Sequence, residues 1–418
     1  MDGDIINFGL ELTSSSIIKV IGVGGGGSNA VNHMLDEGIT GVDFMICNTD
    51  SQALQESKVP VKIQLGVTLT EGRGAGNQPL QGEQAAIENL DDLRVVLEGT
   101  TKMLFITAGL GGGTGTGAAP VIAKLARELN ILTIAVVTIP SPSEGKRRFN
   151  QALEGVDKLK EYVDSMLVIS NEKLHKIYGD LPASQAFKKA DDILTTGVKG
   201  VAEIITLHGN INIDFADVST VMTGSGVFLM GTGFAEGEDR AMKAVKAALD
   251  SPLLDSNDIY GTKDILLNII SGAVEITMGE IGDIIEYLQD AAGQDANIIW
   301  GNGVDERLGD KISVTIIATG FNTNPNKLFQ EEKTKTEFKL DDSMPEINLG
   351  EEDTETENQI ENEPVESTGN KAENKKAGKK RKKEMVSENK DNGNLDNWFH
   401  RQFNRFFEDS DVSLTENE

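Results

Sequence analysis

Short apolar runs alternate with amphipathic segments along the first 320 residues of the chain. Several of these runs are rich in Val and Ile and are followed by a glycine-rich loop and then by apolar residues at helical spacing. Such alternation is typical of a parallel sheet that is covered on both faces. The predicted strands are 17–23, 42–47, 61–65, 103–108, 131–137 and 166–171, with 61–65 at an edge. The pattern therefore predicts an α/β, Rossmann-like nucleotide-binding domain over residues 17–183, preceded by a loose extension at residues 1–16.

A long helical pattern follows this first domain. Apolar residues recur at helical spacing over 184–207, and Gly209 comes next as a candidate C-cap. Further on, the pattern predicts helices at 214–222, 239–249 and 281–288 and strands at 226–233, 265–270, 296–300 and 312–318. We therefore expect a long central helix over 184–209 and a second, smaller α/β domain over 210–321. This domain lacks a phosphate-type glycine cluster, which favours a structural or assembly role.

The pattern changes beyond residue 321. Residues 322–393 are rich in Glu, Asn, Asp, Lys and Thr and hold few large apolar side chains. Because they cannot bury enough surface to offset chain entropy, this segment is predicted to be a disordered linker. Its basic block at 375–383 is interpreted as a solvated charge run, with a weak contact to anionic membrane or nucleic acid as the alternative.

An aromatic segment closes the chain at residues 394–418. On a helix, Leu395, Phe399, Phe403 and either Phe406 or Phe407 would form one apolar stripe. A stripe that follows a disordered linker has no local core to join. We therefore predict a short helix that folds into a partner's groove. The side chains expected to make this contact are Leu395, Trp398, Phe399, Phe403, Phe406 and Phe407.

Charge and composition narrow the class of protein. The net charge of −28 argues against general nucleic-acid affinity. The single cysteine, Cys47, cannot form an intramolecular disulfide, as expected in a reducing cytosol. No signal peptide and no membrane-spanning run are found, so a cytoplasmic protein without membrane insertion is expected. The four histidines share no metal-ligand spacing, so no metal site made by the protein is expected.

Glycine clusters supply the first chemical signal. Residues 109–117 read Gly-Leu-Gly-Gly-Gly-Thr-Gly-Thr-Gly and lie between a predicted strand and a predicted helix. Backbone N–H groups in such a loop, together with a helix N-terminus, form an anion site. No Gly-Lys-Ser/Thr closes the loop, so it is not a Walker A motif. Similar clusters occur at 24–29 and 72–77. All three lie at the carboxyl edge of the predicted sheet, where ligands bind, and indicate a ligand with several phosphates or with phosphate and sugar.

Three short motifs then resemble those of a known family. Residues 111–117 match in full the G-G-G-T-G-[ST]-G signature of the tubulin/FtsZ family of GTPases, whose bacterial members act in cell division. Residues 24–29 resemble the first loop of that family, with Ser28 in place of a common glycine. Residues 212–217 resemble its N-x-D-x-x-D motif, which favours function over a simple helix cap for Asp214 and Asp217. The resemblance covers residues 17–320.

The resemblance implies a site for GTP or GDP. It implies that Glu144 holds the ribose and that Arg148 contacts the nucleotide, although Ser143 stands where an aromatic is common. It also implies that Asn171 and Asp192 read guanine. The remaining contacts that it implies come from Gly25, Gly26, Gly27, Ser28 and Asn29, and at the phosphates from Gly113, Thr114 and Gly115.

It further implies that Asn212, Asp214 and Asp217 reach the γ-phosphate of an adjacent subunit. The two aspartates would orient or polarise the attacking water, with a cation, expected to be Mg²⁺, bound mainly through the nucleotide. These residues lie at the far end of the long helix, which is too long for both of its ends to serve one site. We therefore expect a GTPase whose site is completed between head-to-tail subunits of a filament. By resemblance the filaments would form the division ring at mid-cell, beneath the inner membrane, with tethers and regulators bound to the tail.

Two other functions compete with this interpretation. A Rossmann-type oxidoreductase would use an acidic residue after the second strand for the ribose, and Asp50 could serve. It explains neither 111–117 nor 212–217. A filament protein that binds nucleotide without hydrolysing it is the second alternative, and the two aspartates argue against it.

Overall fold

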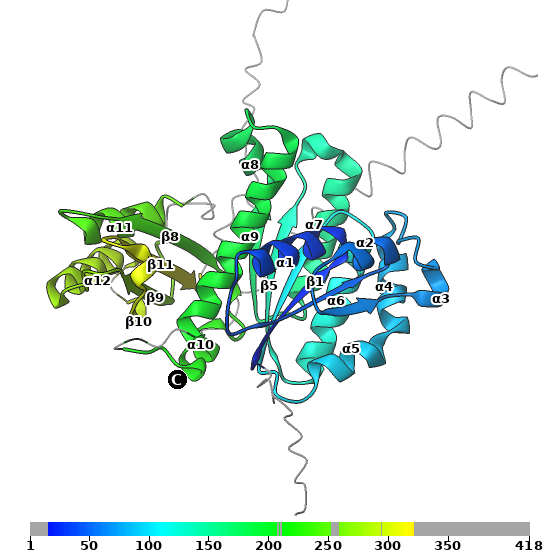
Figure 1. Ribbon diagram of the computed structural model, residues 1–418, viewed down its shortest axis with the longest axis horizontal. Coiled ribbons are helices and arrows are strands. Elements are labelled where there is room, and N and C mark those ends of the chain that lie inside the picture. Colours follow the sequence, from blue (N-terminus) through cyan, green and yellow to red (C-terminus); the bar gives the residue numbers. More distant parts are fainter. Residues whose placement is uncertain (1–15, 207–208, 210, 252–258, 294, 322–418) are drawn as a thin grey trace, which may run out of the picture. The chain divides into compact units, whose positions relative to one another are not determined.

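A computed structural model describes residues 16–206, 209, 211–251, 259–293 and 295–321. The predictions for 1–15, for His208 and for the whole of 322–418 lie outside these residues. A seven-stranded parallel sheet with the order β3-β2-β1-β4-β5-β6-β7 forms the centre of the first domain (Figure 1). Its strands are β1 (Ile18–Val23), β2 (Asp43–Asn48), β3 (Val61–Gln64), β4 (Met103–Gly109), β5 (Leu132–Ile139), β6 (Ser165–Ser170) and β7 (Gly226–Val227). The predicted Rossmann-like sheet is confirmed, and β3 is an edge strand.

Helices cover both faces of this sheet. One face packs against α1 (Gly24–Asp36), α9 (Ala183–Thr206) and α10 (Phe215–Met222) in a first hydrophobic core. The other packs against α4 (Pro79–Glu88), α5 (Leu90–Leu97), α6 (Thr114–Glu128) and α7 (Lys146–Lys160) in a second core. Short helices α2 (Ser51–Glu56), α3 (Val67–Thr70) and α8 (Asn171–Tyr178) complete the domain. Alternate residues of β1, β2 and β4 enter opposite cores, as the period of two requires.

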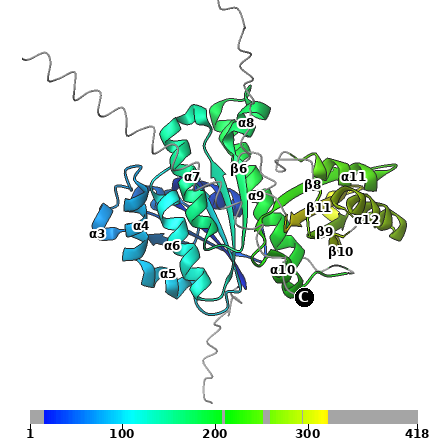
Figure 2. The ribbon, with the colours of Figure 1, turned by 180° about the vertical axis from the view of Figure 1, so that it is seen from behind.

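The predicted long helix is α9, which has 24 residues. Its apolar stripe of Val198, Val201 and Ile204 is buried in the first core. Two glycines allow close packing on either side of it. A Cβ at Gly197 would lie 3.3 Å from side chains of the large sheet, whereas one at Gly200 would overlap Met230 of the second sheet. Figures 1 and 2 show α9 running from beside α8 to beside α10.

The second sheet has the order β10-β9-β11-β8. Its strands are β8 (Leu229–Ala235), β9 (Asp264–Ser271), β10 (Asn297–Val304) and β11 (Ile312–Thr319). The pair β9–β10 is parallel, and β11 is antiparallel to β8 and β9. Helices α11 (Arg240–Leu249) and α12 (Met278–Ala292) pack against it in a third core. The smaller α/β domain is therefore confirmed.

One predicted strand is wrong in an informative way. Residues 226–233 are not a single strand, because β7 pairs with β6 of the large sheet and β8 pairs with β11 of the small one. The switch occurs at Phe228, which is fully buried and still donates its N–H to the Met166 carbonyl at 3.1 Å. Local pattern shows that a segment is extended but not which partner strand it joins.

Two of the glycine clusters contain the starts of helices and are not simply loops. Helix α1 begins at Gly24, within the first glycine cluster, and α6 begins at Thr114, within the cluster at 109–117. A Cβ at Gly27 would overlap the Thr107 carbonyl oxygen of β4. Glycine at such positions allows a helix to approach a strand closely. Helix α7, for which the sequence pattern gave no prediction, starts within the charged segment 143–148.

Among the described residues, no helix is long and apolar enough to cross a membrane.

Candidate active site

Two helix N-termini meet at the carboxyl edge of the large sheet. Helix α1 follows β1 and α6 follows β4, and these two strands are neighbours. A Cβ at Gly24 would lie 2.9 Å from the Gly115 nitrogen, so only glycine allows the helices to come this close. The first N–H groups of each helix have no partner within the helix. The first turns of α1 and α6, called here the phosphate cradle, therefore form a site for an anion.

A cavity of about 330 Å³ opens beside the phosphate cradle. Four chain segments form it: the start of α1, the loop after β4, the segment between β5 and α7, and the helices α8 and α9. Its lining residues are Gly26, Asn29, Gly109, Leu110, Gly111, Gly112, Thr138, Pro140, Glu144, Arg148, Asn171, Ala190, Asp191 and Leu194. Gly111 has φ 94°, and a Cβ there would lie 2.7 Å from the Arg148 carbonyl oxygen. The loop conformation therefore requires glycine.

Glu144 and Asn171 are held together on one wall of the cavity. Glu144 Oε1 accepts the Ser141 N–H at 3.0 Å within a capping box, and it also accepts Asn171 Nδ2 at 3.0 Å. Asn171 Oδ1 is buried and has no hydrogen-bond partner. A buried acceptor without a partner is costly, so it indicates a donor supplied by a ligand. Arg148, in the first turn of α7, brings a positive charge to the same cavity.

Helix α9 contributes Asp191 to the cavity rather than the predicted Asp192. Asp192 Oδ1 lies 2.7 Å from His33 Nε2, and its Oδ2 accepts Lys189 Nζ at 2.8 Å. Burial raises the pKa of Asp191 to about 6. Helical spacing carried a signal for this assignment, because Ala190, Asp191 and Leu194 share one face of the helix and Asp192 is turned about 100° away.

The other predicted contacts divide into two groups. Gly26, Asn29, Glu144, Arg148 and Asn171 line the cavity. The rest do not line it but occupy the first turns of the two helices or the residue just before α6: Gly25, Gly27, Ser28, Gly113, Thr114 and Gly115. Sequence reasoning missed two lining residues, Thr138 near the end of β5 and Pro140 just after it. Neither belongs to a motif.

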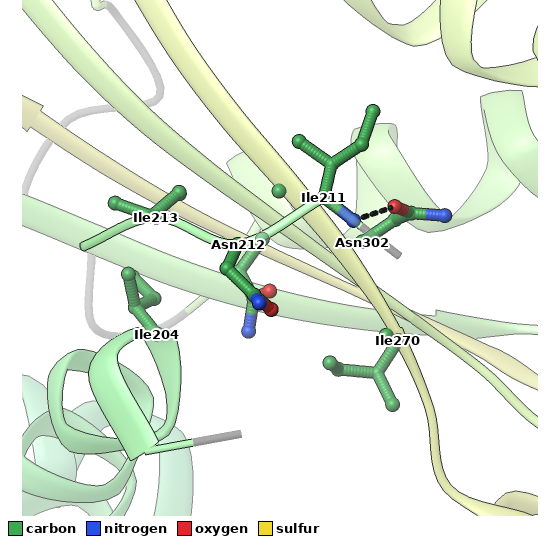
Figure 3. A pocket seen from close by; sticks show the side chains of 9 residues that line it. Ile204, Ile211, Asn212, Ile213, Ile270 and Asn302 are labelled. Atoms are coloured by element: carbon green, nitrogen blue, oxygen red, sulfur yellow. Dashed lines mark hydrogen bonds between the residues drawn. The ribbon is translucent and has the colours of Figure 1, made fainter. Parts of the chain in front are cut away.

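The segment that carries Asn212, Asp214 and Asp217 is attached to the second sheet. Ile211 and Asn302 of β10 form an antiparallel bridge, with the Asn302 N–H on the Ile211 carbonyl at 3.0 Å. The Ile211 N–H also reaches Asn302 Oδ1 at 3.0 Å, as Figure 3 shows. A Cβ at Gly301 would lie 2.9 Å from the Ile211 oxygen. This strand pairing fixes where the segment begins.

The two aspartates form a capping box at the start of α10. Asp214 is the N-cap and its Oδ1 accepts the Asp217 N–H at 2.8 Å, while Asp217 Oδ2 accepts the Asp214 N–H at 3.2 Å. Asn212 Oδ1 accepts the Gly209 N–H at 2.6 Å. Asp214 and Asn212 are exposed, and Asp217 is partly exposed. The arrangement is rigid and presents acidic groups outward.

The cavity and this capping box lie at opposite ends of α9. From Asp191 to Thr206 the helix rises about 22 Å, and Asn212 lies beyond that end. The aspartates of one chain therefore cannot enter the cavity of the same chain.

Two alternative uses of acidic residues find no support. Asp50 caps α2, accepting the N–H groups of Gln52 and Ala53, and it does not line the cavity. Within the described ranges, no group of three or more His, Cys, Asp or Glu side chains could hold a metal ion.

These features define a class of protein: an α/β nucleotide-binding protein that holds phosphates on two helix N-termini without a Walker A loop. Comparison with known families agrees. The model described as "Tubulin/FtsZ family, GTPase domain" matches residues 17–179, and "FtsZ family, C-terminal domain" matches residues 226–322.

Curated relatives and solved structures give the same result. "Cell division protein FtsZ" of Porphyromonas gingivalis is 46% identical over 331 residues, which are 78% of this chain and 72% of the relative. The protein of that name from Azotobacter vinelandii is 48% identical over 318 residues, 76% of this chain and 80% of the relative. The structure "FtsZ dimer, empty" from M. jannaschii has a TM-score of 0.68 and 42% identity, and covers 74% of this chain and 90% of its own. CetZ2 from Haloferax volcanii, at 20% identity, TM-score 0.62 and coverage of 72% and 92%, shows the shared fold.

The chain belongs to the tubulin/FtsZ family. It is a GTP-binding and GTP-hydrolysing cytoskeletal protein of cell division, as the sequence predicted. Nothing in the fold or the comparisons supports an oxidoreductase.

Proposed function

We propose that GTP binds in the cavity with its phosphates on the phosphate cradle and its base against α9. Asn171 Oδ1, buried without a partner, and the Asp191 carboxylate are the acceptors that the guanine edge requires. Glu144 is placed by two hydrogen bonds to accept from the ribose hydroxyls, and Arg148 neutralises phosphate charge. In this proposal Asp192, the guanine contact expected from the sequence, does not touch the base, because His33 and Lys189 engage both of its oxygens.

A magnesium ion fits this site only through the nucleotide. The described residues around the cradle offer backbone N–H groups and threonine hydroxyls, and Thr114 Oγ1 lies 2.7 Å from Thr49 Oγ1. Mg²⁺ prefers phosphate oxygens and retained waters in such sites. The ion would supply charge neutralisation at the terminal phosphates, while the chain's own groups position the nucleotide.

We further propose that hydrolysis requires a second copy of the chain. The observation that carries this proposal is the separation of the cavity from Asn212, Asp214 and Asp217 along α9. Stacking head to tail would bring the outward-facing capping box of one subunit to the cavity of the next. There the two aspartates would orient the water that attacks the terminal phosphate. Such a contact is heterologous and extends into an open filament. The dimeric relative from M. jannaschii supports self-association.

The test measures filament assembly and GTP hydrolysis separately, by sedimentation and by phosphate release. Asp217→Asn should bind GTP and sediment as filaments with it, but release phosphate about 100-fold more slowly than wild type. Asp290→Asn, on the exposed surface of α12, serves as the matched loss of one carboxylate and should hydrolyse GTP normally. Normal phosphate release by Asp217→Asn would contradict the proposed role.

We propose that the filaments form the division ring at mid-cell, beneath the inner membrane. The aromatic tail side chains predicted from the sequence would bind membrane tethers and regulators there. Deleting residues 394–418 should leave GTP hydrolysis and sedimentation of filaments unchanged. It should abolish recruitment of the protein to the division ring. Ring recruitment that survives the deletion would contradict the role of the tail.

A further inference from the structure

His33 connects the two helices that flank the nucleotide cavity. It lies near the end of α1, and its side chain is only 12% exposed. Its Nε2 atom lies 2.7 Å from Asp192 Oδ1 on α9. Helix α1 also supplies Asn29 to the cavity, and α9 supplies Asp191. A single side-chain contact therefore joins the helix of the phosphate cradle to the helix beside the base.

Asp192 is held from two directions. Burial by itself would raise the pKa of this carboxyl, but hydrogen bonds from Lys189 and His33, and the charges of both, outweigh burial and lower it. The carboxylate therefore stays ionised, and both of its oxygens are engaged inside the protein. Asp192 therefore bridges His33 and Lys189, and the adjacent Asp191 is the aspartate that faces the cavity.

Asp191 depends on the same histidine. Burial is the main cause that raises the pKa of this carboxyl to about 6, and the charge of Asp192 raises it further. The charge of His33 acts in the opposite direction and lowers it. Guanine presents two donors, N1–H and the 2-amino group, and a carboxylate offers an oxygen to each only when it is ionised. Loss of the histidine charge would therefore weaken the acceptor that guanine needs.

We propose that His33 is a positioning residue for guanine, which fixes α9, and with it Asp191, against α1 through its contact with Asp192. This inference rests on the proposed contact between Asp191 and the base. The pKa of Asp191 is raised to about 6, and the charge of His33 lowers it. The contact therefore affects nucleotide binding more at pH 6 than at pH 8, which an uncharged contact would not do.

Few charged groups surround this histidine in the described part of the chain. From α9 it faces Asp191 and Asp192, with Lys189 behind the latter. On its own helix, Asp36 is exposed and pairs with Lys58 at 2.8 Å. The strands under α1 contribute apolar side chains to the first core. The two aspartates are thus the groups that its charge influences most.

The experiment measures GDP affinity of the full chain at pH 6 and pH 8, at concentrations too low for assembly. His33→Gln keeps an N–H donor for Asp192 but cannot carry charge. It should equal wild type at pH 8 and bind about 3- to 10-fold more weakly than wild type at pH 6. His33→Arg, which stays charged, should restore tight binding at pH 6. Lys58→Gln, which removes an exposed cation from Asp36 on the same helix as His33, is the matched control and should keep the wild-type profile.

The outcomes distinguish this inference from the proposed function. Equal pH profiles for wild type and His33→Gln would overturn the role of the charge, as would an equal loss at both pH values. If His33→Gln did not fold, failure of His33→Arg to flatten the profile between pH 6 and pH 8 would overturn it instead. Asp191→Ala tests the proposed contact itself. If that variant bound GDP like wild type, guanine recognition by Asp191 would be wrong whatever His33 does.

Discussion

At the scale of a single residue, the proposed base recognition depends on Asp191. A carboxylate accepts from the N1–H and 2-amino groups of guanine, whereas adenine presents a bare ring nitrogen at the equivalent position. A site built around such an acceptor rejects the wrong base, because the buried carboxylate would be left without donors. The side chain lines the cavity beside Leu194, and Asn171 supplies a second acceptor on the opposite segment.

Replacing this carboxylate should therefore reduce selectivity. Asp191→Ala is expected to bind GDP about 10- to 100-fold more weakly than wild type, because one charged hydrogen-bonding group is lost. Binding of ADP should not fall in parallel, since adenine gains nothing from the carboxylate. The measurement is a titration with both nucleotides under conditions that prevent assembly. Equal losses for GDP and ADP would contradict base recognition.

Nucleotide affinity should also depend on pH. The pKa of Asp191 in the free protein is raised to about 6, so the ionised acceptor is present above that pH and is lost as the pH falls through it. GDP affinity of the wild type should therefore be nearly constant from pH 8 to pH 7 and decrease below about 6. In Asp191→Asn, which cannot ionise, this decrease should be absent. A decrease of the same size in that variant would show that another group titrates.

Sequence reasoning predicted Asp192 on α9 as a base contact, whereas the structure has the neighbouring Asp191 in the lining of the cavity. Motif resemblance identifies a segment, and this segment contains two consecutive aspartates, Asp191 and Asp192, that could fill the same role. Which of them faces the cavity depends on the rotation of the helix, which is set by packing of Val198, Val201 and Ile204 into the first core. The phosphate cradle could be predicted, because clustered glycines are visible in the sequence and allow the two helix starts to approach closely.

At the scale of elements, a two-residue pairing positions the segment that is proposed to be catalytic. Ile211 pairs with Asn302 of β10, and the chain then passes through Asn212 to the capping box that starts α10. If the proposal is right, the second domain contributes to the chemistry by fixing this segment. Glycines at 301 and 303 leave room for it, since a Cβ at Gly301 would meet the Ile211 oxygen and the Ile213 side chain.

Adding one methyl group at this point should impair catalysis without affecting nucleotide binding. Gly301→Ala would displace residues 211–213, at a cost of about 1 to 3 kcal/mol in strain. We expect GDP affinity to stay at the wild-type level, while GTP hydrolysis under assembly conditions falls about tenfold. Gly282→Ala on α12, where a Cβ meets nothing within 4 Å, is the matched control. Unchanged hydrolysis by Gly301→Ala would argue against this positioning role.

A buried ion pair holds the helices of the second domain together. The Arg240 guanidinium, on α11, contacts Glu280 of α12 at 2.8 Å and also donates to the carbonyls of Val274 and Glu275. The hydrogen bond from Arg240, helped by hydrogen bonds from Thr277, lowers the pKa of Glu280 to about 2 against the opposing effect of burial. Its stabilising effect is therefore complete above the ordinary carboxyl range and is lost as the pH falls toward 2.

Removing the cation should destabilise the domain at neutral pH. Arg240→Met is expected to lower the free energy of unfolding by about 2 to 3 kcal/mol, because Glu280 loses its partner and two carbonyls lose a donor. Urea denaturation at pH 7 measures this. The double variant Arg240→Met, Glu280→Gln should recover part of the loss. A single variant as stable as wild type would show that the pair contributes nothing.

The extent of the elements could largely be predicted, but not their partners. Periodicity located α9 and the strands of both sheets, because burial on one or both faces imposes the pattern directly. It did not separate β7 from β8, since pairing with β6 or β11 is decided by contacts distant in sequence. Helix α7 was also missed, because its polar first turn resembles a charged loop.

At the scale of the whole molecule, the nucleotide cavity and the acidic capping box lie at opposite ends of α9. This separation was predictable from the sequence, because helix length follows from residue number alone. In the proposed mechanism one chain carries halves of two different sites, and the GTP that one subunit binds is hydrolysed only when the next subunit arrives.

Concentration dependence of GTP hydrolysis tests this link most directly. The rate per subunit is measured for the full chain with saturating GTP, from concentrations well below to well above the onset of sedimentation. A shared site predicts a rate near zero for isolated subunits, a rise where filaments appear, and a plateau beyond. A rate per subunit that stayed constant across this range, at the plateau value, would show that each chain holds a complete site and would contradict the proposed mechanism.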